Sequence, residues 1–445
     1  MGGMRIFAAA AFTVLSIVAA GCGGSSSGVA SGAALGTGAA NLVPADASAF
    51  ASVDTDLGSQ QWTQLSALTK DFPARAKLLD QVNAELQKHQ LTLKDDVEPA
   101  LGPETDAAQL GKDDVVFTKP DDKAKLDALA KKLSTSDEQY TVQEIGGWSV
   151  VADAPDVFDR VRAAQNGSSL ADSNTFKSAW AEVAGDALIR VYATGAAMKS
   201  GGTPATGPEW LAARAWADSS ALRVQAVAKP NGAAPATSTQ PMLHDVPSGA
   251  TLAVSFHGSA DLKRKLGRLA PKTPAGGFQL SDLAALASSD GVAYVRSSGL
   301  IPEIAIELAP KNPQTALTAA RAAVARLGGA IGPVPLTVQL TNGKVVISDG
   351  PAAAAALHSG PKLTADQAYK DAIHAAGVPA RTTFVAYADV TQLAPFLQVA
   401  AGALGGSATA PDPSLGDTLS HVGTVVAWGS ADGGLTRFGA WIRPR

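Results

Sequence analysis

The sequence of 445 residues contains a single cysteine, Cys22, which excludes any disulfide within the chain. It also lacks an excess of positive charge: 36 Lys and Arg stand against 40 Asp and Glu, the net charge is −4, and only 17% of the residues are charged. Binding to nucleic acid depends on neutralising many phosphates, so the sequence predicts no nucleic-acid partner. Hydrophobic residues make up 46% of the chain, which is enough for one or more ordinary cores.

The motifs that usually reveal an enzyme or a cofactor site are also missing. There is no Gly-rich phosphate-binding loop in a strand-to-helix context and no His-Glu-x-x-His. A Gly-x-Ser-x-Gly occurs at residues 24–28, but no predicted strand precedes it and no predicted helix follows it. The histidines do not share the spacing of metal ligands; they are His89, His244, His257, His358, His374 and His421. We therefore predict no catalytic residue, no metal site and no cofactor.

Acidic pairs are a recurring polar pattern. Asp54-Thr-Asp56-Leu-Gly58 resembles the start of a calcium-binding EF-hand loop, but its glycine comes one position early and the twelfth residue is Leu65 instead of Glu. Asp122 follows a proline at a predicted helix start, where a carboxylate offsets exposed backbone N–H groups. Asp95-Asp96 lead into Val97 and Pro99, where the favoured interpretation is a turn held by hydrogen bonds to its own backbone. At these pairs we predict no cation site.

The N-terminal apolar run, residues 6–20, is shorter than the ~20 residues of a membrane-spanning helix. It follows Arg5 and ends in small residues, which is the layout of an export signal. We therefore predict a signal peptide over residues 1–21 that is cleaved after Gly21.

The last residues of this leader, Val18-Ala19-Ala20-Gly21-Cys22, resemble the lipobox of bacterial lipoproteins. In that motif the cysteine thiol, the best nucleophile available for a thioether, receives a diacylglyceryl group and a peptidase cuts just before it. The resemblance implies lipidation at Cys22 and a position on the extracytoplasmic face of the cell membrane, in the cell envelope, because two or more acyl chains such as palmitate anchor a protein stably. The alternative is an ordinary secretory signal that ends next to an unmodified cysteine.

Composition and self-comparison divide the chain into five segments. Residues after Cys22 are Gly, Ser and Ala without charge, which is typical of a flexible tether. A second stretch, rich in Ala, Pro and Ser, predicts a linker near the middle. The predicted segments are the signal peptide 1–21, the lipidated tether 22–41, a first repeat 42–229, the linker 230–244 and a second repeat 245–445.

The two repeats are predicted from blocks that match in order and spacing. Gly147–Asp153 aligns with Gly343–Asp349, and some twenty residues later Leu170-x₅-Phe176 aligns with Leu363-x₅-Tyr369. The same register continues into a predicted strand in each half, 187–192 and 382–387. Such agreement is hard to attribute to chance and indicates an internal duplication.

Each half predicts strands paired by hairpins and covered by helices. Gly146-Gly147 and Asn342-Gly343 lie between β-type runs and tolerate the positive φ of a tight hairpin. Leu126, Leu129 and Leu133 repeat at helical spacing and predict a helix packed on a sheet. The fold class that follows is α+β, with two similar halves of mainly antiparallel sheet covered by helices.

Several blocks together resemble an uncharacterised bacterial family, the domain-of-unknown-function family three-three-five-two. They are the leader, the Val-Pro-x-Asp at residues 43–46, Phe72-Pro73, the acidic segment 95–99 and the block at 170–176. The resemblance covers most of the first half and, more weakly, the second. It implies an exported or membrane-tethered lipoprotein of the actinobacterial type, and no activity.

These observations favour a non-catalytic binding or interaction module that contacts the membrane through its lipid and an unknown envelope protein or small ligand. The alternatives are a lipid or small-solute carrier with a cleft between the halves, and a hydrolase with an unrecognised motif. Trp216 and Trp428 occupy matched positions and are interpreted as core anchors. Trp148 has Lys344 as its counterpart and is therefore a candidate ligand contact.

Overall fold

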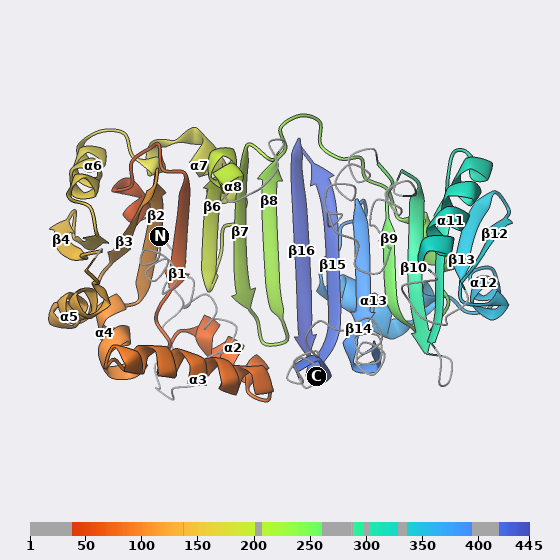
Figure 1. Ribbon diagram of the computed structural model, residues 1–445, viewed down its shortest axis with the longest axis horizontal. Coiled ribbons are helices and arrows are strands. Elements are labelled where there is room, and N and C mark those ends of the chain that lie inside the picture. The colour runs from red at the N-terminus through yellow and green to blue at the C-terminus, as the bar shows by residue number, and fades with distance from the viewer. Residues whose placement is uncertain are drawn as a thin grey trace. The chain divides into compact units, whose positions relative to one another are not determined.

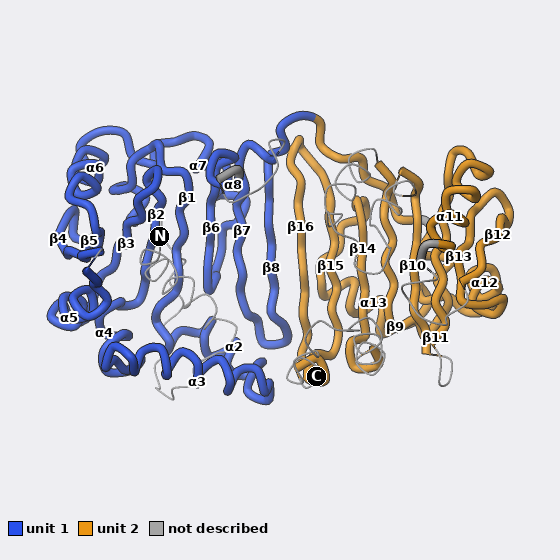
Figure 2. The backbone as a smooth tube through the Cα atoms, viewed as in Figure 1, with its two compact units in different colours: residues 1–232 blue, residues 233–445 orange. Residues whose placement is uncertain are grey.

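The computed structural model describes residues 38–136, 138–200, 207–259, 286, 288–297, 302–327, 336–393 and 418–445. The chain divides into two compact units, Met1–Gly232 and Ala233–Arg445 (Figure 2). The predicted signal peptide, its cleavage site at Gly21 and the lipidation site at Cys22 lie outside the described residues. Among the helices that are described, none has the length and hydropathy to cross a membrane.

Unit 1 contains an antiparallel sheet in the strand order β4-β5-β3-β2-β1-β6-β7-β8 (Figure 1). Its strands are β1 (Ala49–Asp54), β2 (Glu104–Leu110), β3 (Asp113–Thr118), β4 (Thr141–Ile145), β5 (Trp148–Ala152), β6 (Ile189–Thr194), β7 (Trp210–Ala217) and β8 (Leu222–Lys229). Its helices are η1 (Ala39–Asn41), α2 (Gln60–Thr69), α3 (Pro73–Lys88), η2 (Leu93–Val97), α4 (Glu98–Leu101), α5 (Lys123–Leu133), α6 (Pro155–Asn166), η3 (Leu170–Asp172), α7 (Asn174–Ala181) and α8 (Gly195–Ser200).

Helices pack on both faces of this sheet, because successive side chains of a strand point to opposite sides. On one face Val116 of β3 belongs to a core that includes the predicted stripe of α5, which is buried. On the other face Phe50 of β1 packs edge-on against Phe176 and Trp180 of α7, with ring centroids 5.7 and 5.4 Å apart. The cap of α5 is confirmed, since the Asp122 carboxylate accepts from two backbone N–H groups of the first turn.

Unit 2 contains an antiparallel sheet in the order β12-β13-β11-β10-β9-β14-β15-β16 (Figure 1). Its strands are β9 (Ala250–Phe256), β10 (Asp290–Ser297), β11 (Pro302–Ala309), β12 (Thr337–Thr341), β13 (Lys344–Ser348), β14 (Phe384–Asp389), β15 (Val422–Asp432) and β16 (Leu435–Pro444). Its helices are η4 (Pro241–Asp245), α11 (Pro313–Leu327), α12 (Pro351–Ala356), η5 (Leu363–Ala365) and α13 (Gln367–Ala375). The prediction of an α+β fold with mainly antiparallel sheet is confirmed.

The strands of the two units follow one another in the same spatial order, with β1 to β8 in the places of β9 to β16. The predicted hairpins are confirmed: φ is +60° and +78° at Gly146 and Gly147, and +52° and +77° at Asn342 and Gly343. A matching isolated antiparallel bridge lies just before the first strand of each sheet, Pro44 to Ser169 in unit 1 and Pro247 to Lys362 in unit 2.

Two predicted boundaries differ from the structure. Residues 38–41, placed in the tether, form η1 and its start, and Ala39 and Ala40 are fully buried because their small side chains fit against unit 1. Residues 238–244, placed in the linker, belong to unit 2. Ser238 pairs with Thr382, and the buried Gln240 side chain bonds Ser255 Oγ at 2.6 Å and the Thr382 carbonyl at 3.0 Å. The sequence predicted loops here because both segments are too short to show the hydrophobic periodicity of a helix or a strand.

Candidate functional site

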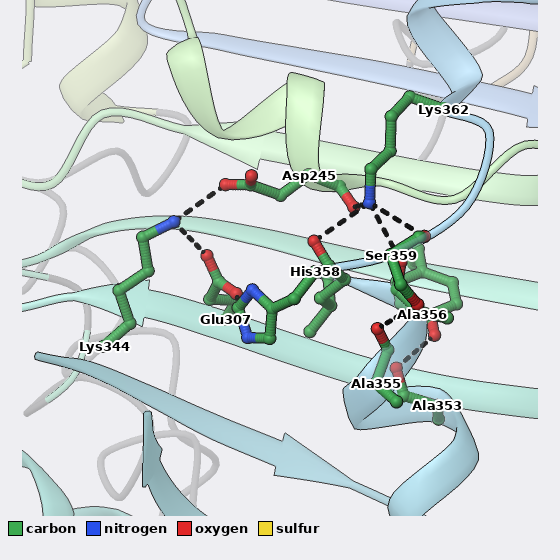
Figure 3. Close-up of polar contacts among 11 residues, drawn as sticks. Asp245, Glu307, Lys344, Ala353, Ala355, Ala356, His358, Ser359 and Lys362 are labelled. Atoms are coloured by element: carbon green, nitrogen blue, oxygen red, sulfur yellow. Dashed lines mark hydrogen bonds and ion pairs between the residues drawn. The ribbon is translucent and has the colours of Figure 1, made fainter. Parts of the chain in front are cut away.

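Five charged or titratable side chains of unit 2 form a cluster on one face of its sheet (Figure 3). We call them the unit 2 polar cluster; they are Asp245 at the end of η4, Glu307 on β11, Lys344 at the start of β13, His358 after α12, and Lys362 before η5. Glu307 is the deepest member, with its side chain fully buried, whereas Lys344, Asp245 and His358 are about one-third exposed. The cluster therefore has a buried carboxylate under a partly exposed rim.

Ion pairs join these groups into one network. Lys344 Nζ donates to Glu307 Oε1 at 2.5 Å and to Asp245 Oδ2 at 2.8 Å. The second carboxylate oxygen, Glu307 Oε2, lies 3.6 Å from His358 Nε2 and has no hydrogen bond among the described residues. One oxygen of Glu307 is therefore paired with a cation, while the other has only the more distant imidazole of His358 near it.

Burial and the ion pairs oppose each other in setting the pKa values of Glu307 and Lys344. Burial raises the pKa of Glu307, because the charged form loses its hydration, while the hydrogen bond and charge of Lys344 oppose this. Burial alone would lower the pKa of Lys344, but the hydrogen bonds to Asp245 and Glu307 outweigh it and raise the pKa. Lys344 is therefore held in its charged form and does not present the free amine of a nucleophile.

Lys362 binds backbone instead of carboxylates. Its ammonium donates to the carbonyls of Asp245, Ala356, Leu357 and Ser359 at 3.0 to 3.3 Å. Three of these follow from the end of α12, where carbonyls are left without helical partners, so Lys362 caps that helix and ties it to η4 (Figure 3).

The equivalent positions of unit 1 are apolar. Strand register gives Phe117 the position that Glu307 has in unit 2. Phe117 on β3 pairs with the third residue of β5, and Glu307 on β11 pairs with the third residue of β13; both partners are valines. Trp148 follows the two-residue turn of the hairpin β4–β5, and Lys344 follows that of the hairpin β12–β13. Leu42 takes the place of Asp245, because each precedes the valine whose carbonyl accepts from Leu170 N or Leu363 N.

Trp148, the predicted ligand contact, lies inside this apolar set. Its indole is 5% exposed, with Lys119 Nζ 4.4 Å from the ring centroid on one side. A Cβ added to Gly38 would lie 2.8 Å from the ring, so backbone packs closely there. A side chain buried to this degree offers almost no surface to a ligand, and its role in this structure is packing.

The predicted core anchors are less buried than expected. Trp216 and Trp428 are both half-buried. The Arg214 guanidinium lies 4.2 Å from the ring centroid of Trp216, a cation–π contact that keeps the indole near the surface. The matching of Trp216 and Trp428 between the two halves of the sequence therefore did not reveal how deeply their side chains are buried.

The pair Asp54 and Asp56 forms the turn that starts α2. Asp54 accepts from Ser59 Oγ at 2.6 Å and from Asp56 N at 3.1 Å, while Asp56 accepts from Gly58 N at 2.9 Å. Ser59 in turn accepts from Trp62 N as the helix cap. Burial, opposed by these hydrogen bonds, raises the pKa of Asp54 to about 7.

In the described part of the chain, no three His, Cys, Asp or Glu side chains converge as metal ligands. The closest acid–imidazole contact joins His257 Nδ1 and Asp290 Oδ1 at 2.7 Å and links the end of β9 to the start of β10. Gly258 N donates to the same oxygen, so Asp290 is held within a tight connection.

The sequence does not predict the unit 2 polar cluster, because its members come from five separate segments. One signal is present in the sequence: Glu307 interrupts an apolar strand at the position of Phe117, as Lys344 stands at the position of Trp148.

Comparisons with known proteins leave the family of this chain open. No family model and no curated protein matches it. Crystal form I of TP0453 matches with 9% identity and a TM-score of 0.25, covering 44% of this chain and 79% of that one. Crystal form III matches with 10% identity and a TM-score of 0.26, covering 56% and 96%. Both TM-scores are too low to relate the folds.

Proposed function

We propose that this chain is an exported lipoprotein, held on the extracytoplasmic face of the membrane by acyl chains on Cys22, that works as a non-catalytic binding or interaction module. The observation that carries the proposal is the leader, in which Arg5, the apolar run 6–20 and small residues come directly before Cys22. The likeness to the domain-of-unknown-function family three-three-five-two agrees with this location.

The tether predicted over residues 22–41 overlaps the folded body, because Ala39 and Ala40 of η1 are fully buried against unit 1. In this proposal the lipid supplies the attachment, because the chain has no net positive charge that would draw it to an anionic membrane.

We propose in addition that the two units arose by internal duplication. The common strand order, the paired hairpins with positive φ and the matched bridges before each sheet support this. In this view Leu42, Phe117 and Trp148 keep an apolar packing that unit 2 replaced by the linked charges of Asp245, Glu307 and Lys344.

A non-catalytic role is supported by the way the charged groups are used. In the unit 2 polar cluster Lys344 is shared by two carboxylates, and Lys362 is bound to backbone carbonyls. A catalytic amine or acid needs a free reactive atom at the right protonation state. The cluster instead joins η4, β11, β13 and the end of α12 into one framework.

Membrane attachment is tested by fractionation of the full-length protein with Cys22→Ser, using Ser25→Ala as the matched control in the same segment. We expect the unchanged protein and Ser25→Ala in the membrane fraction, and Cys22→Ser in the soluble fraction or as an unprocessed precursor, because the thioether cannot form. Recovery of Cys22→Ser as processed protein in the membrane fraction would contradict the proposal.

A further inference from the structure

Strand β12 is the last strand at one edge of the unit 2 sheet (Figure 1). It pairs with β13 on one side, and within the described part of the chain no other strand pairs with it. Its residues, Thr337–Thr341, include no charge and no proline, and its register with β13 has no bulge. Apart from being short, β12 therefore has none of the features by which proteins usually keep an edge strand from pairing with another chain.

The matching edge of unit 1 does carry a charge. Residues 141–143 of β4 and 337–339 of β12 are both Thr-Val-Gln, and the next residue is Glu144 in β4 and Leu340 in β12. Glu144 is exposed and its carboxylate lies 3.1 Å from Lys123 Nζ. Leu340 is 37% exposed. One unit thus has a charged residue at this edge, and the other has an exposed apolar residue at the same position.

The hairpin determines which backbone groups of β12 point outward. A two-residue turn follows β12, so the flanking Thr341 and Lys344 form a hydrogen-bonded pair. Such pairs alternate with non-bonded pairs along an antiparallel ladder. The N–H and C=O groups of Val338 and Leu340 therefore point away from β13, where a further strand can bond them.

We infer that β12 pairs with β12 of a second copy of this chain, antiparallel and about a twofold axis at Gln339. In this register Val338 of each copy lies opposite Leu340 of the other, and each such pair exchanges two backbone hydrogen bonds. Thr337 lies opposite Thr341, and Gln339 lies opposite its own counterpart. All residues of the strand are then paired without any charge at the contact, and the twofold axis closes the assembly at two copies.

The side chains favour a second β12 over other strands of this chain. Val338 and Leu340 face the same side of the sheet, where Val338 packs against the core that includes Leu317 of α11. The twofold axis brings the exposed Leu340 of each copy to Val338 of the other, at the border of that core. Pairing of β12 with β4 in the corresponding register would instead place Glu144 opposite Val338.

The contact is small, which determines how it can be detected. A contact made by one short strand is smaller than the standard interface of about 1,200–2,000 Å², so we expect a weak dimer that is best trapped covalently. The inference goes beyond the proposed function, because it depends neither on the lipid nor on any other partner.

The test introduces Gln339→Cys into the full chain, forms disulfides in the producing cells with a mild oxidant, and detects dimers by non-reducing electrophoresis. A non-bonded antiparallel pair has Cα atoms about 4.5 Å apart, within the ~4.4–6.8 Å range of a disulfide, so we expect a cross-linked dimer. Thr341→Cys is the matched control, because its counterpart would lie roughly 13 Å farther along the strand. The unchanged chain, whose single cysteine is Cys22, gives the background.

A charge variant supplies the second readout. Leu340→Glu gives β12 the residue that β4 has at this position, and in the Gln339→Cys chain it should lower the cross-linked fraction by roughly fivefold or more. Leu340→Val, which stays apolar, should preserve the cross-link. No dimer with Gln339→Cys, equal cross-linking with Thr341→Cys, or an unchanged yield with Leu340→Glu would overturn the inference. These outcomes do not bear on the Cys22 fractionation, so a failure here is distinguishable from a failure of the membrane anchor.

Discussion

Lys344 of unit 2 and Trp148 of unit 1 hold the same place in their sheets: each is the first residue of its strand after a two-residue turn, paired with the last residue of the strand before it. One ends in a network of charges and the other in a packed apolar set. The same backbone position thus holds a charged residue in one sheet and an apolar residue in the other. The neighbouring position differs in the same way: Glu307 accepts a hydrogen bond from Lys344, whereas Phe117 is buried and apolar.

Replacing Lys344 by Met should expose how much Glu307 depends on it. The variant leaves a fully buried carboxylate without its ammonium, and we expect a loss of about 2–3 kcal/mol in the free energy of unfolding. This is less than the cost of breaking a fully buried pair because Lys344 is 29% exposed. Chemical denaturation at neutral pH measures the loss.

The second step of this prediction is the double variant Glu307→Gln with Lys344→Met. Removing the buried charge together with its partner should recover most of the stability lost in the single variant, since the cost arises from the uncompensated carboxylate. If the single and double variants are equally unstable, the network does not depend on charge compensation.

Asp54 should make the stability of unit 1 depend on pH. Its pKa is about 7 in the folded protein against 3.8 for the ordinary group, so the folded state holds a proton that the unfolded state has lost. Its contribution is full below pH ~4 and is lost as pH rises toward 7. Asp54→Asn should therefore flatten the fall in stability between about pH 4 and pH 7, measured by denaturation midpoints. A pH profile identical to that of the unchanged protein would show that Asp54 is not the titrating group.

Gly102 is a position where only glycine fits. Its φ is +62°, and an added Cβ would lie 2.0 Å from the Lys119 carbonyl oxygen, which is backbone and cannot move aside. We expect Gly102→Ala to cost at least ~2 kcal/mol in the free energy of unfolding. Gly111→Ala is the matched control, with φ of +77° and no atom within 4 Å of the added Cβ. Equal losses in both variants would mean that backbone strain alone, and not the contact with Lys119, sets the cost.

Local chemistry made parts of this fold predictable. The turns at Gly146-Gly147 and Asn342-Gly343 depend on positive φ, which few residues tolerate, and the cap at Asp122 depends on its own neighbours. The sequence predicted a mainly antiparallel sheet but not the order of its strands, because strand pairing and register are set by contacts between residues far apart in the chain.

The candidate sites were less accessible to prediction for the same reason. Glu307 meets Lys344 and Asp245 only after three segments are folded together, and no local pattern marks a carboxylate that will be buried. The sequence predicted a turn at Asp95-Asp96, whereas both residues lie in the π-helix η2, whose span Leu93–Val97 has no distinctive residue pattern. The expected hydrogen bond to nearby backbone is present, because Asp96 Oδ2 accepts from Thr92 N–H.

The central claim, a lipid on one cysteine, is tested most directly by the mass of the N-terminal peptide of the protein purified from the membranes of its own host. The account predicts a peptide that begins at Cys22 and carries a diacylglyceryl thioether. A peptide that retains residues 1–21, or one in which Cys22 is unmodified, would contradict it.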